Sequence, residues 1–152
     1  MANDVDYGDP QVEEAWCEER RAEVASYLRS HKVEHGEIGE WPAWHLPPYV
    51  SIWAIESAVT PGAMGWWAIC GDLPTDYASS RGLADPREAM RAFAERWRKA
   101  AISMQDGRAD PETRIGRTPE ERKSLAPILE KRAALLARWA EDEELWEDLW
   151  DE

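Results

Sequence analysis

Residues 71–77, Gly-Asp-Leu-Pro-Thr-Asp-Tyr, form the densest polar cluster within the most apolar part of the chain. Asp72 and Asp76 flank Thr75, and Tyr77 follows directly. Paired acids can hold a divalent cation, or act as general acid and general base when their environments differ. Aspartate is equally typical of turns, because its side chain accepts hydrogen bonds from nearby backbone N–H groups. We favour this structural interpretation, because no histidine follows at ligand spacing and two acids complete neither kind of site.

A second candidate site is the aromatic segment before this cluster. Trp41, Trp44, His45 and Tyr49 are interleaved with prolines and could form a wall for a ligand or a proline-rich peptide. The alternative, which we favour, is a lid of Trp and Pro packed over a sheet. His45 is the only histidine of the apolar centre. A single histidine beside tryptophans is more often a core residue than a catalyst.

Other signals for catalysis are weak. Cys70 lies in an apolar run and is expected to be an inert buried thiol, since use as a nucleophile would require His45 as its base. Glu56 is expected near Asp72, where the two could form a carboxylate pair. The chain has no G-x-S-x-G elbow and no glycine-rich phosphate loop. We therefore expect no metal or cofactor, and the sequence leans away from an enzyme without assigning a catalytic residue.

The acidic tail offers a candidate partner site. Leu145, Trp146, Leu149 and Trp150 form an apolar stripe among acids. We expect Leu145 and Trp146 to close the core of the domain. For Leu149 and Trp150 two interpretations stay open: the same packing, or docking in a basic-rimmed groove of a partner.

The elements that must position these residues are readable from caps, prolines and periodicity. Asp9 and Pro10 predict a helix that runs to about Ser30, with a short strand at residues 32–37. Three prolines predict irregular structure over residues 41–48. Residues 50–57 and 65–71 predict an antiparallel hairpin, and residues 77–80 a third, edge strand.

Two further helices follow. Residues 85–88 form a capping box for a helix to about Met104, and Thr118 caps another that Pro127 should break or kink before it continues to about Trp139. The first of these should bury one side, which comprises Met90, Phe93, Ala94, Trp97 and Ala101. The prediction is an α+β fold: a small antiparallel sheet of two to three strands flanked by three or four helices, in a single domain over residues 1–146, with an acidic tail at residues 147–152.

Composition excludes several functions. The 152 residues carry a net charge of −13, and residues 141–152 hold eight acids and no base. Such a balance disfavours nucleic acid, which needs Lys and Arg at its phosphates, and anionic membrane surfaces. We expect no signal peptide and no membrane span, and two cysteines without CxxC spacing suit a reducing cytoplasm.

Several motifs together resemble a known bacterial family. They are Trp16-Cys17, Pro48-Tyr49-Val50-Ser51-Ile52-Trp53, the string at residues 67–76, Pro86-Arg87-Glu88-Ala89, Trp97, Arg132-Ala133 and Leu145-Trp146. The chain is similar in these to a domain of unknown function, DUF4826. The resemblance spans nearly the whole chain up to Trp146 and implies one domain. It supplies no activity, and it makes Asp72 and Asp76 the first residues to test.

The leading hypothesis is a small cytoplasmic protein that binds a partner or ligand without catalysing a reaction. Its acidity would suit a basic protein partner, as in toxin-immunity proteins. The alternative is a metal-assisted hydrolase that uses Asp72 and Asp76, with Glu56 or His45. A third hypothesis is a subunit that pairs with itself through its Trp-rich face. The oligomeric state does not follow from the sequence.

Overall fold

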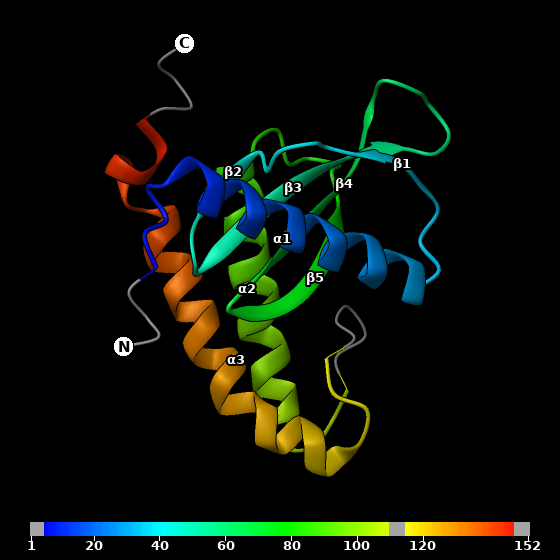
Figure 1. Ribbon diagram of the computed structural model, residues 1–152. Coiled ribbons are helices and arrows are strands. Elements are labelled where there is room, and N and C mark those ends of the chain that lie inside the picture. Colours follow the sequence, from blue (N-terminus) through cyan, green and yellow to red (C-terminus); the bar gives the residue numbers. More distant parts are fainter. Residues whose placement is uncertain (1–4, 110–114, 148–152) are drawn as a thin grey trace. The chain divides into compact units, whose positions relative to one another are not determined.

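The computed structural model describes residues 5–109 and 115–147 (Figure 1). The chain divides into two compact units, of which the first ends at Pro86 and the second begins at Arg87. The single domain expected over residues 1–146 stays a prediction. Leu149 and Trp150 lie outside the described residues.

The first unit opens with helix α1, Pro10–Ser30. The carboxylate of Asp9 accepts a hydrogen bond from the backbone N–H of Gln11 at 2.9 Å, and Pro10 fits the first turn because it has no N–H to satisfy. One side of the helix is buried, namely Trp16, Cys17, Val24 and Leu28. The helix predicted from Asp9 and Pro10 is thus confirmed.

A five-stranded antiparallel sheet follows, larger than the two or three strands expected. Its strands are β1 His35–Ile38, β2 Trp44–Leu46, β3 Val50–Ser57, β4 Met64–Gly71 and β5 Leu73–Ser79. The order is β1-β3-β4-β5, and β2 also pairs with β3. Both β1 and β2 use the same edge of β3, at its end and its beginning respectively. The predicted hairpin is β3 and β4, and the third strand predicted at residues 77–80 overlaps β5, which begins four residues earlier, at Leu73, and ends at Ser79.

The expectation of irregular backbone over residues 41–48 was wrong for β2. None of Trp44, His45 and Leu46 is a proline, so each keeps its backbone N–H. These three residues pair with Ile52, Ser51 and Val50 of β3. The prolines on both sides limit this strand to three residues.

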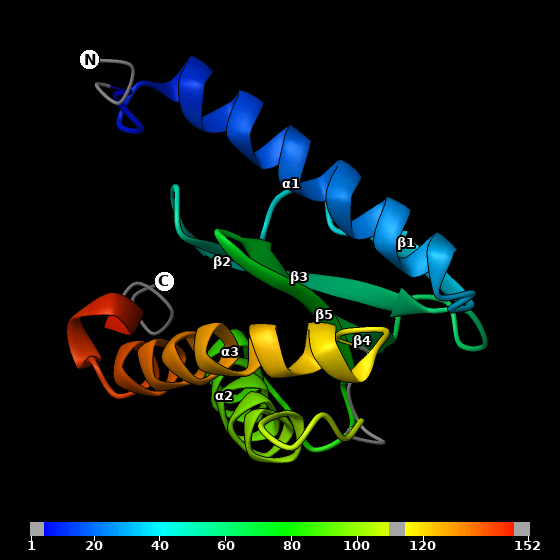
Figure 2. The same cartoon turned by 90° about the horizontal axis from the view of Figure 1, so that it is seen from below.

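Helix α1 crosses one face of the sheet (Figures 1 and 2). The core between them joins α1 to β1, β3, β4 and β5. Its fully or nearly buried residues are Val24, Leu28, Ile38, Trp53, Ile55, Ala68, Cys70 and Tyr77. Because side chains alternate along a strand, these residues also show which strand positions face α1.

The second unit contains α2 Pro86–Met104, α3 Pro119–Ala140 and a short 3₁₀ helix, η1, Glu143–Trp146. Helix α2 ends where predicted, and the five residues expected to be buried are buried. Thr118 caps α3 as predicted, with its hydroxyl accepting from Glu121 N–H at 3.0 Å. Helix α3, however, runs continuously through Pro127. The lost hydrogen bond is offset by buried residues further along the same helix, among them Leu129 and Leu136.

Arg87 fastens the start of α2 to the end of α3. Its side chain is buried, and Nε donates to the carbonyl oxygen of Ala140 at 2.6 Å. Its terminal nitrogens donate to both carboxylate oxygens of Glu143, at 2.9 and 3.3 Å. Trp146 is fully buried, as predicted, and its indole N–H donates to the carbonyl of Trp139 at 2.9 Å.

Candidate functional site

The turn from β4 to β5 depends on Gly71. Its φ is +146°, and a Cβ at this position would lie 2.5 Å from the carbonyl oxygen of Tyr49. The N–H of Asp72 donates to the same oxygen at 2.9 Å. Only glycine permits such a close approach of two backbones. The polar cluster at residues 71–77 therefore begins with a glycine that the backbone geometry requires.

The two aspartates of this string are not brought together. Asp72 is exposed in the turn, whereas Asp76 is only 2% exposed within β5. The Oδ1 of Asp76 accepts from the N–H of Tyr77 at 2.8 Å. Four residues of strand separate their Cα atoms by about 13 Å, too far for one divalent cation to bind both carboxylates directly.

Thr75 and Tyr77 face α1, on the side of β5 opposite to Asp76. The ring of Tyr77 lies 6.0 Å from that of Tyr27 on α1 and 5.7 Å from that of Trp66, measured between centroids. Thr75 is half-buried and shares a shallow hollow with residues of α1. Tyr77 therefore contributes to the core. Asp72, Thr75 and Asp76 do not converge on one site, because Asp72 is exposed in the turn and Thr75 and Asp76 lie on opposite faces of β5.

His45 is held in an aromatic cluster that joins β2 to α1. Its Nε2 lies 2.9 Å from Oε2 of Glu13. The imidazole stacks on Trp16 with centroids 6.3 Å apart, and it forms a T-shaped contact with Trp41, whose ring centroid lies 5.7 Å away. A carboxylate bonded to histidine can position a general base, and it equally fixes a helix to a sheet.

Of the predicted aromatic wall, Trp41 and His45 lie together. Trp44 is half-buried and points to the opposite face of β2 from His45, while Trp41 and Tyr49 are 47% and 50% exposed. Sequence reasoning missed Glu13 and Trp16. Their spacing of three residues on a predicted helix was the available signal, because it places both on one side.

Cys70 is buried in a small polar network. Its Sγ lies 3.4 Å from the hydroxyl oxygen of Ser51, which itself accepts from the indole N–H of Trp53 at 2.9 Å. Burial raises the pKa of the Cys70 thiol to about 12, and Glu23 raises it further. The thiol is therefore protonated at neutral pH, which argues against a nucleophile and agrees with the expected inert role.

Glu56 lies far from Asp72, so the expected pair between them is not formed. Glu56 pairs with Met64 at one end of the hairpin, whereas Gly71, next to Asp72, pairs with Val50 at the other. Val50 and Glu56 are six residues apart along β3, a distance of about 20 Å.

Glu56 instead lines an acidic hollow at the β1 edge of the sheet. The hollow has a volume of about 400 Å³, and three carboxylates line it, those of Glu37, Glu40 and Glu56. No basic residue is among its lining residues, and Met64, which is 42% exposed, supplies an apolar wall. Sequence reasoning missed Glu37, which lies on β1, and Glu40, which lies two residues beyond its end. No local pattern showed that this segment lies beside Glu56 of β3.

The acidic hollow belongs to the strongly acidic part of the chain. Residues 1–86 hold 15 acids and 5 bases, a net charge of −10, whereas residues 87–140 hold 8 acids and 13 bases, a net charge of +5. The lining carboxylates of Glu37 and Glu40, and those of Glu14 and Glu18 on α1, are exposed and have no ion-pair partner among the described residues. Unpaired like charges of this kind attract cationic groups.

Neither a cluster of three metal ligands nor a membrane helix is found in the described part of the chain. Residues 5–109 and 115–147 contain no group of three or more His, Cys, Asp or Glu side chains placed to hold a metal ion. No helix within them is both long and apolar enough to cross a bilayer.

The fold and site define an acidic α+β protein whose first unit pairs one helix with a five-stranded antiparallel sheet. The chain belongs to the family described as Domain of unknown function (DUF4826), whose sequence model matches residues 10–146. Comparison with curated proteins and with solved structures gave no match.

Proposed function

We propose that the protein is a non-catalytic binding protein whose first unit takes a basic protein partner. The observation that carries the proposal is the acidic hollow, a concave site with three carboxylates and no base, on a unit whose net charge is −10. Such a site accepts a cation and repels an anion.

A Lys or Arg side chain of the partner fits the chemistry of the acidic hollow. Its aliphatic stem would lie along Met64, and its charged head would reach the carboxylates of Glu37, Glu40 and Glu56. The surrounding unpaired acids, including Glu14 and Glu18, would speed association by long-range attraction. Exposed Trp41 and Tyr49 add aromatic surface of the kind enriched at protein interfaces.

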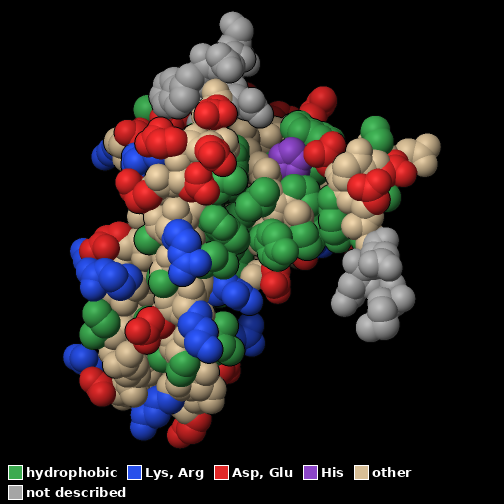
Figure 3. Space-filling view, turned by 90° about the vertical axis from the view of Figure 1, so that its left-hand side faces the viewer, with side chains coloured by type: hydrophobic (Ala, Val, Ile, Leu, Met, Phe, Trp, Pro, Cys, Tyr) green, Lys and Arg blue, Asp and Glu red, His purple; other side chains and the backbone are tan. Residues whose placement is uncertain are grey.

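The role would be that of a neutralising partner, as with toxin-immunity proteins, and a reducing cytoplasm suits its two free cysteines. The separation of Asp72 from Asp76 supports binding over the metal-assisted hydrolase. Over the helices of the second unit, by contrast, Lys and Arg side chains lie among acidic ones (Figure 3), so the first unit is the stronger attractor of basic proteins.

The test is retention of basic proteins by the immobilised chain. Lysate of the source cells is passed over the wild type and over the triple variant Glu37→Gln/Glu40→Gln/Glu56→Gln, and retained proteins are identified by mass spectrometry. We expect basic proteins to be retained by the wild type, released by added salt, and lost from the triple variant.

The control is the triple variant Glu120→Gln/Glu121→Gln/Glu144→Gln, which removes three exposed acids of the second unit. It changes the net charge by the same amount, so it should retain the same basic proteins as the wild type. Equal losses in both triple variants would assign retention to net charge alone and overturn the acidic hollow as the site. Retention of no basic protein would overturn the function.

A further inference from the structure

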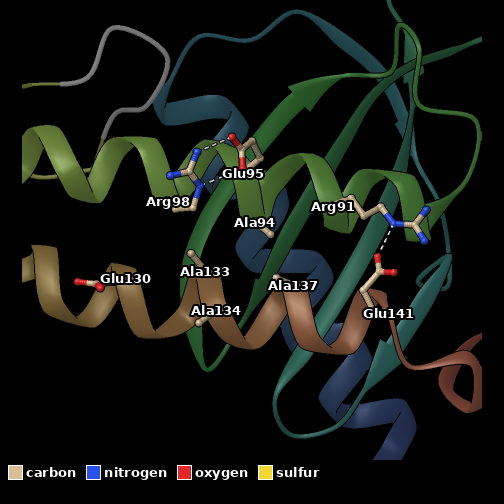
Figure 4. Close-up of a pocket in the computed structure, with 9 residues that line it drawn as sticks. All are labelled: Arg91, Ala94, Glu95, Arg98, Glu130, Ala133, Ala134, Ala137 and Glu141. Carbon is tan, nitrogen blue, oxygen red and sulfur yellow. Dashed lines mark hydrogen bonds and ion pairs between the residues drawn. The ribbon is translucent and has the colours of Figure 1, made fainter.

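Helices α2 and α3 of the second unit lie side by side and antiparallel, with a groove between them (Figure 4). Its volume is about 370 Å³. The floor consists of alanines, Ala94 from α2 and Ala133, Ala134 and Ala137 from α3. Ala134 and Ala137 are exposed. Small side chains let another helix approach the backbone closely, so the floor of this groove suits a helical occupant.

The two rims of the groove carry opposite charges. The α2 rim presents Arg91 and Arg98 beside one acid, Glu95, and the α3 rim presents Glu130 and Glu141, so the net charges of the two rims are +1 and −2 (Figure 4). Arg91 spans the groove to Glu141 at 2.9 Å. Arg98 bonds instead to Glu95 of its own helix, at 2.7 and 3.0 Å. Glu130 is exposed and has no ion-pair partner among the described residues.

The geometry points to a second copy of this chain as the occupant. A two-fold axis along the groove places α2 of one copy over α3 of the other. The basic rim of each copy then faces the acidic rim of its partner. A two-fold axis across the groove would instead place α2 on α2 and α3 on α3, so that each rim would face a rim of the same net charge. The charges thus select one of the two symmetric arrangements.

The positions along the helices agree with this arrangement. Arg91 and Glu141 are level with each other, as their contact shows. Seven residues of α2 separate Arg98 from Arg91 by about 10 Å, and eleven residues of α3 separate Glu130 from Glu141 by about 16 Å. Along the helix axes, Arg98 of one copy and Glu130 of the other are therefore offset by about 6 Å. An arginine side chain is long enough to bridge this distance. Arg98 of each copy can therefore exchange its exposed pair with Glu95 for the unpaired Glu130 of the other copy.

Ile102 extends the same contact surface. It follows Arg98 by four residues, so it lies on the same side of α2, and it is 52% exposed. The dimer would cover this side chain and the alanine floor, while each copy keeps its acidic hollow on the other unit. Self-association therefore does not depend on the proposed binding of a basic partner.

The experiment is sedimentation velocity of the full chain over a range of concentration, from about 5 µM to about 500 µM, because dimers form by mass action. We expect the mass to rise from the monomer value of 17.4 kDa towards twice that value. Ala134→Glu places a carboxylate on the apolar floor and should abolish the rise. A monomer at every concentration, or a dimer that survives Ala134→Glu, would overturn the proposal.

Charge reversal identifies the rims. Arg98→Glu should weaken self-association about tenfold or more, and Arg98→Glu/Glu130→Arg should restore it. Lys99→Glu makes the same charge change one residue away and off the groove lining, so it should dimerise like the wild type. Circular dichroism melts confirm that every variant is folded. Equal weakening by Arg98→Glu and Lys99→Glu, or no recovery in the double variant, would contradict the arrangement.

Discussion

At the scale of single residues, Gly71 occupies a position where the backbone geometry permits only glycine. Two independent features exclude a side chain there: a φ of +146° and the carbonyl oxygen of Tyr49 at 2.5 Å from any added Cβ. We predict that Gly71→Ala lowers the free energy of unfolding by about 1–3 kcal/mol, because strain and the backbone contact act together. Urea unfolding followed by circular dichroism measures this loss.

Gly62 provides the matched control for that prediction. Its φ is +84°, but an added Cβ would meet no atom within 4 Å. Gly62→Ala should therefore show only the cost of the backbone conformation, about 1 kcal/mol. Equal effects of the two substitutions would mean that the contact with Tyr49 contributes nothing.

Cys70 gives a prediction about pH. An unfolded thiol loses its proton near its ordinary pKa of 9.0, whereas burial raises the pKa of Cys70 in the folded chain to about 12. Between these values the unfolded state binds fewer protons, so stability is fully present below pH 9 and falls as pH rises. The slope for one thiol is up to about 1.4 kcal/mol per pH unit. Urea unfolding between pH 8 and pH 10 should therefore show a shallower decline in Cys70→Ala than in the wild type. Parallel declines would contradict the role of this thiol.

At the scale of elements, Arg87 connects three pieces of the second unit. It is 8% exposed and bonds to a backbone carbonyl at the end of α3 and to Glu143 of η1. We predict that Arg87→Met costs about 2 kcal/mol, because the carbonyl of Ala140 loses a charged donor. Differential scanning calorimetry would record the lower transition temperature.

Arg91→Met is the comparison for Arg87→Met. Arg91 also pairs with a glutamate at 2.9 Å, but both side chains are largely exposed. Exposed pairs contribute less than about 1 kcal/mol, so this variant should melt close to the wild type. If Arg91→Met is the more damaging of the two, burial is not what gives Arg87 its effect.

Elements were largely predictable from local rules, and their pairings were not. The cap at Asp9, the cap at Thr118 and the apolar run at Val50–Ser57 each predicted an element that the structure contains. The three-residue strand β2 was not predicted, because the prolines on both sides of it indicated irregular structure. The continuity of α3 through Pro127 was not predicted either. Burial of its side chains in the tertiary structure, which the sequence does not show, outweighed one missing hydrogen bond.

The candidate site was less predictable than the fold. Asp72 and Asp76 look paired in sequence, yet a strand carries them apart because its residues advance by about 3.3 Å each. Glu37, Glu40 and Glu56 look unrelated in sequence, yet the pairing of β1 with β3 brings them to one hollow. Strand register, which no local pattern encodes, decides both outcomes.

At the scale of the whole molecule, charge varies along the chain in blocks. The acidic first 86 residues are followed by a basic stretch and then by an acidic tail. Repulsion within the acidic blocks opposes the compact state. We predict that raising NaCl from about 0.01 M to about 0.1 M, which shortens the Debye length from about 30 Å to about 10 Å, raises Tm by about 2–4 °C.

The variant Glu14→Gln/Glu18→Gln tests the source of that salt effect. These unpaired acids stand four residues apart on α1 and repel each other. Their replacement should raise Tm at low salt and reduce the further gain from NaCl, as measured by differential scanning fluorimetry. A Tm that falls with added salt would show that attractive pairs, and not repulsion, dominate.

The loop between β3 and β4 is a suitable place to attach a fluorescent dye. Val59 at its tip is 88% exposed, whereas both native cysteines are buried. A Val59→Cys variant would thus carry one accessible thiol beside two shielded ones, and a maleimide dye would couple there selectively. The dye would sit on the loop whose Gly62 and Ala63 border the acidic hollow. Its emission and anisotropy would then report occupancy of the hollow directly, in solution and without an immobilised chain.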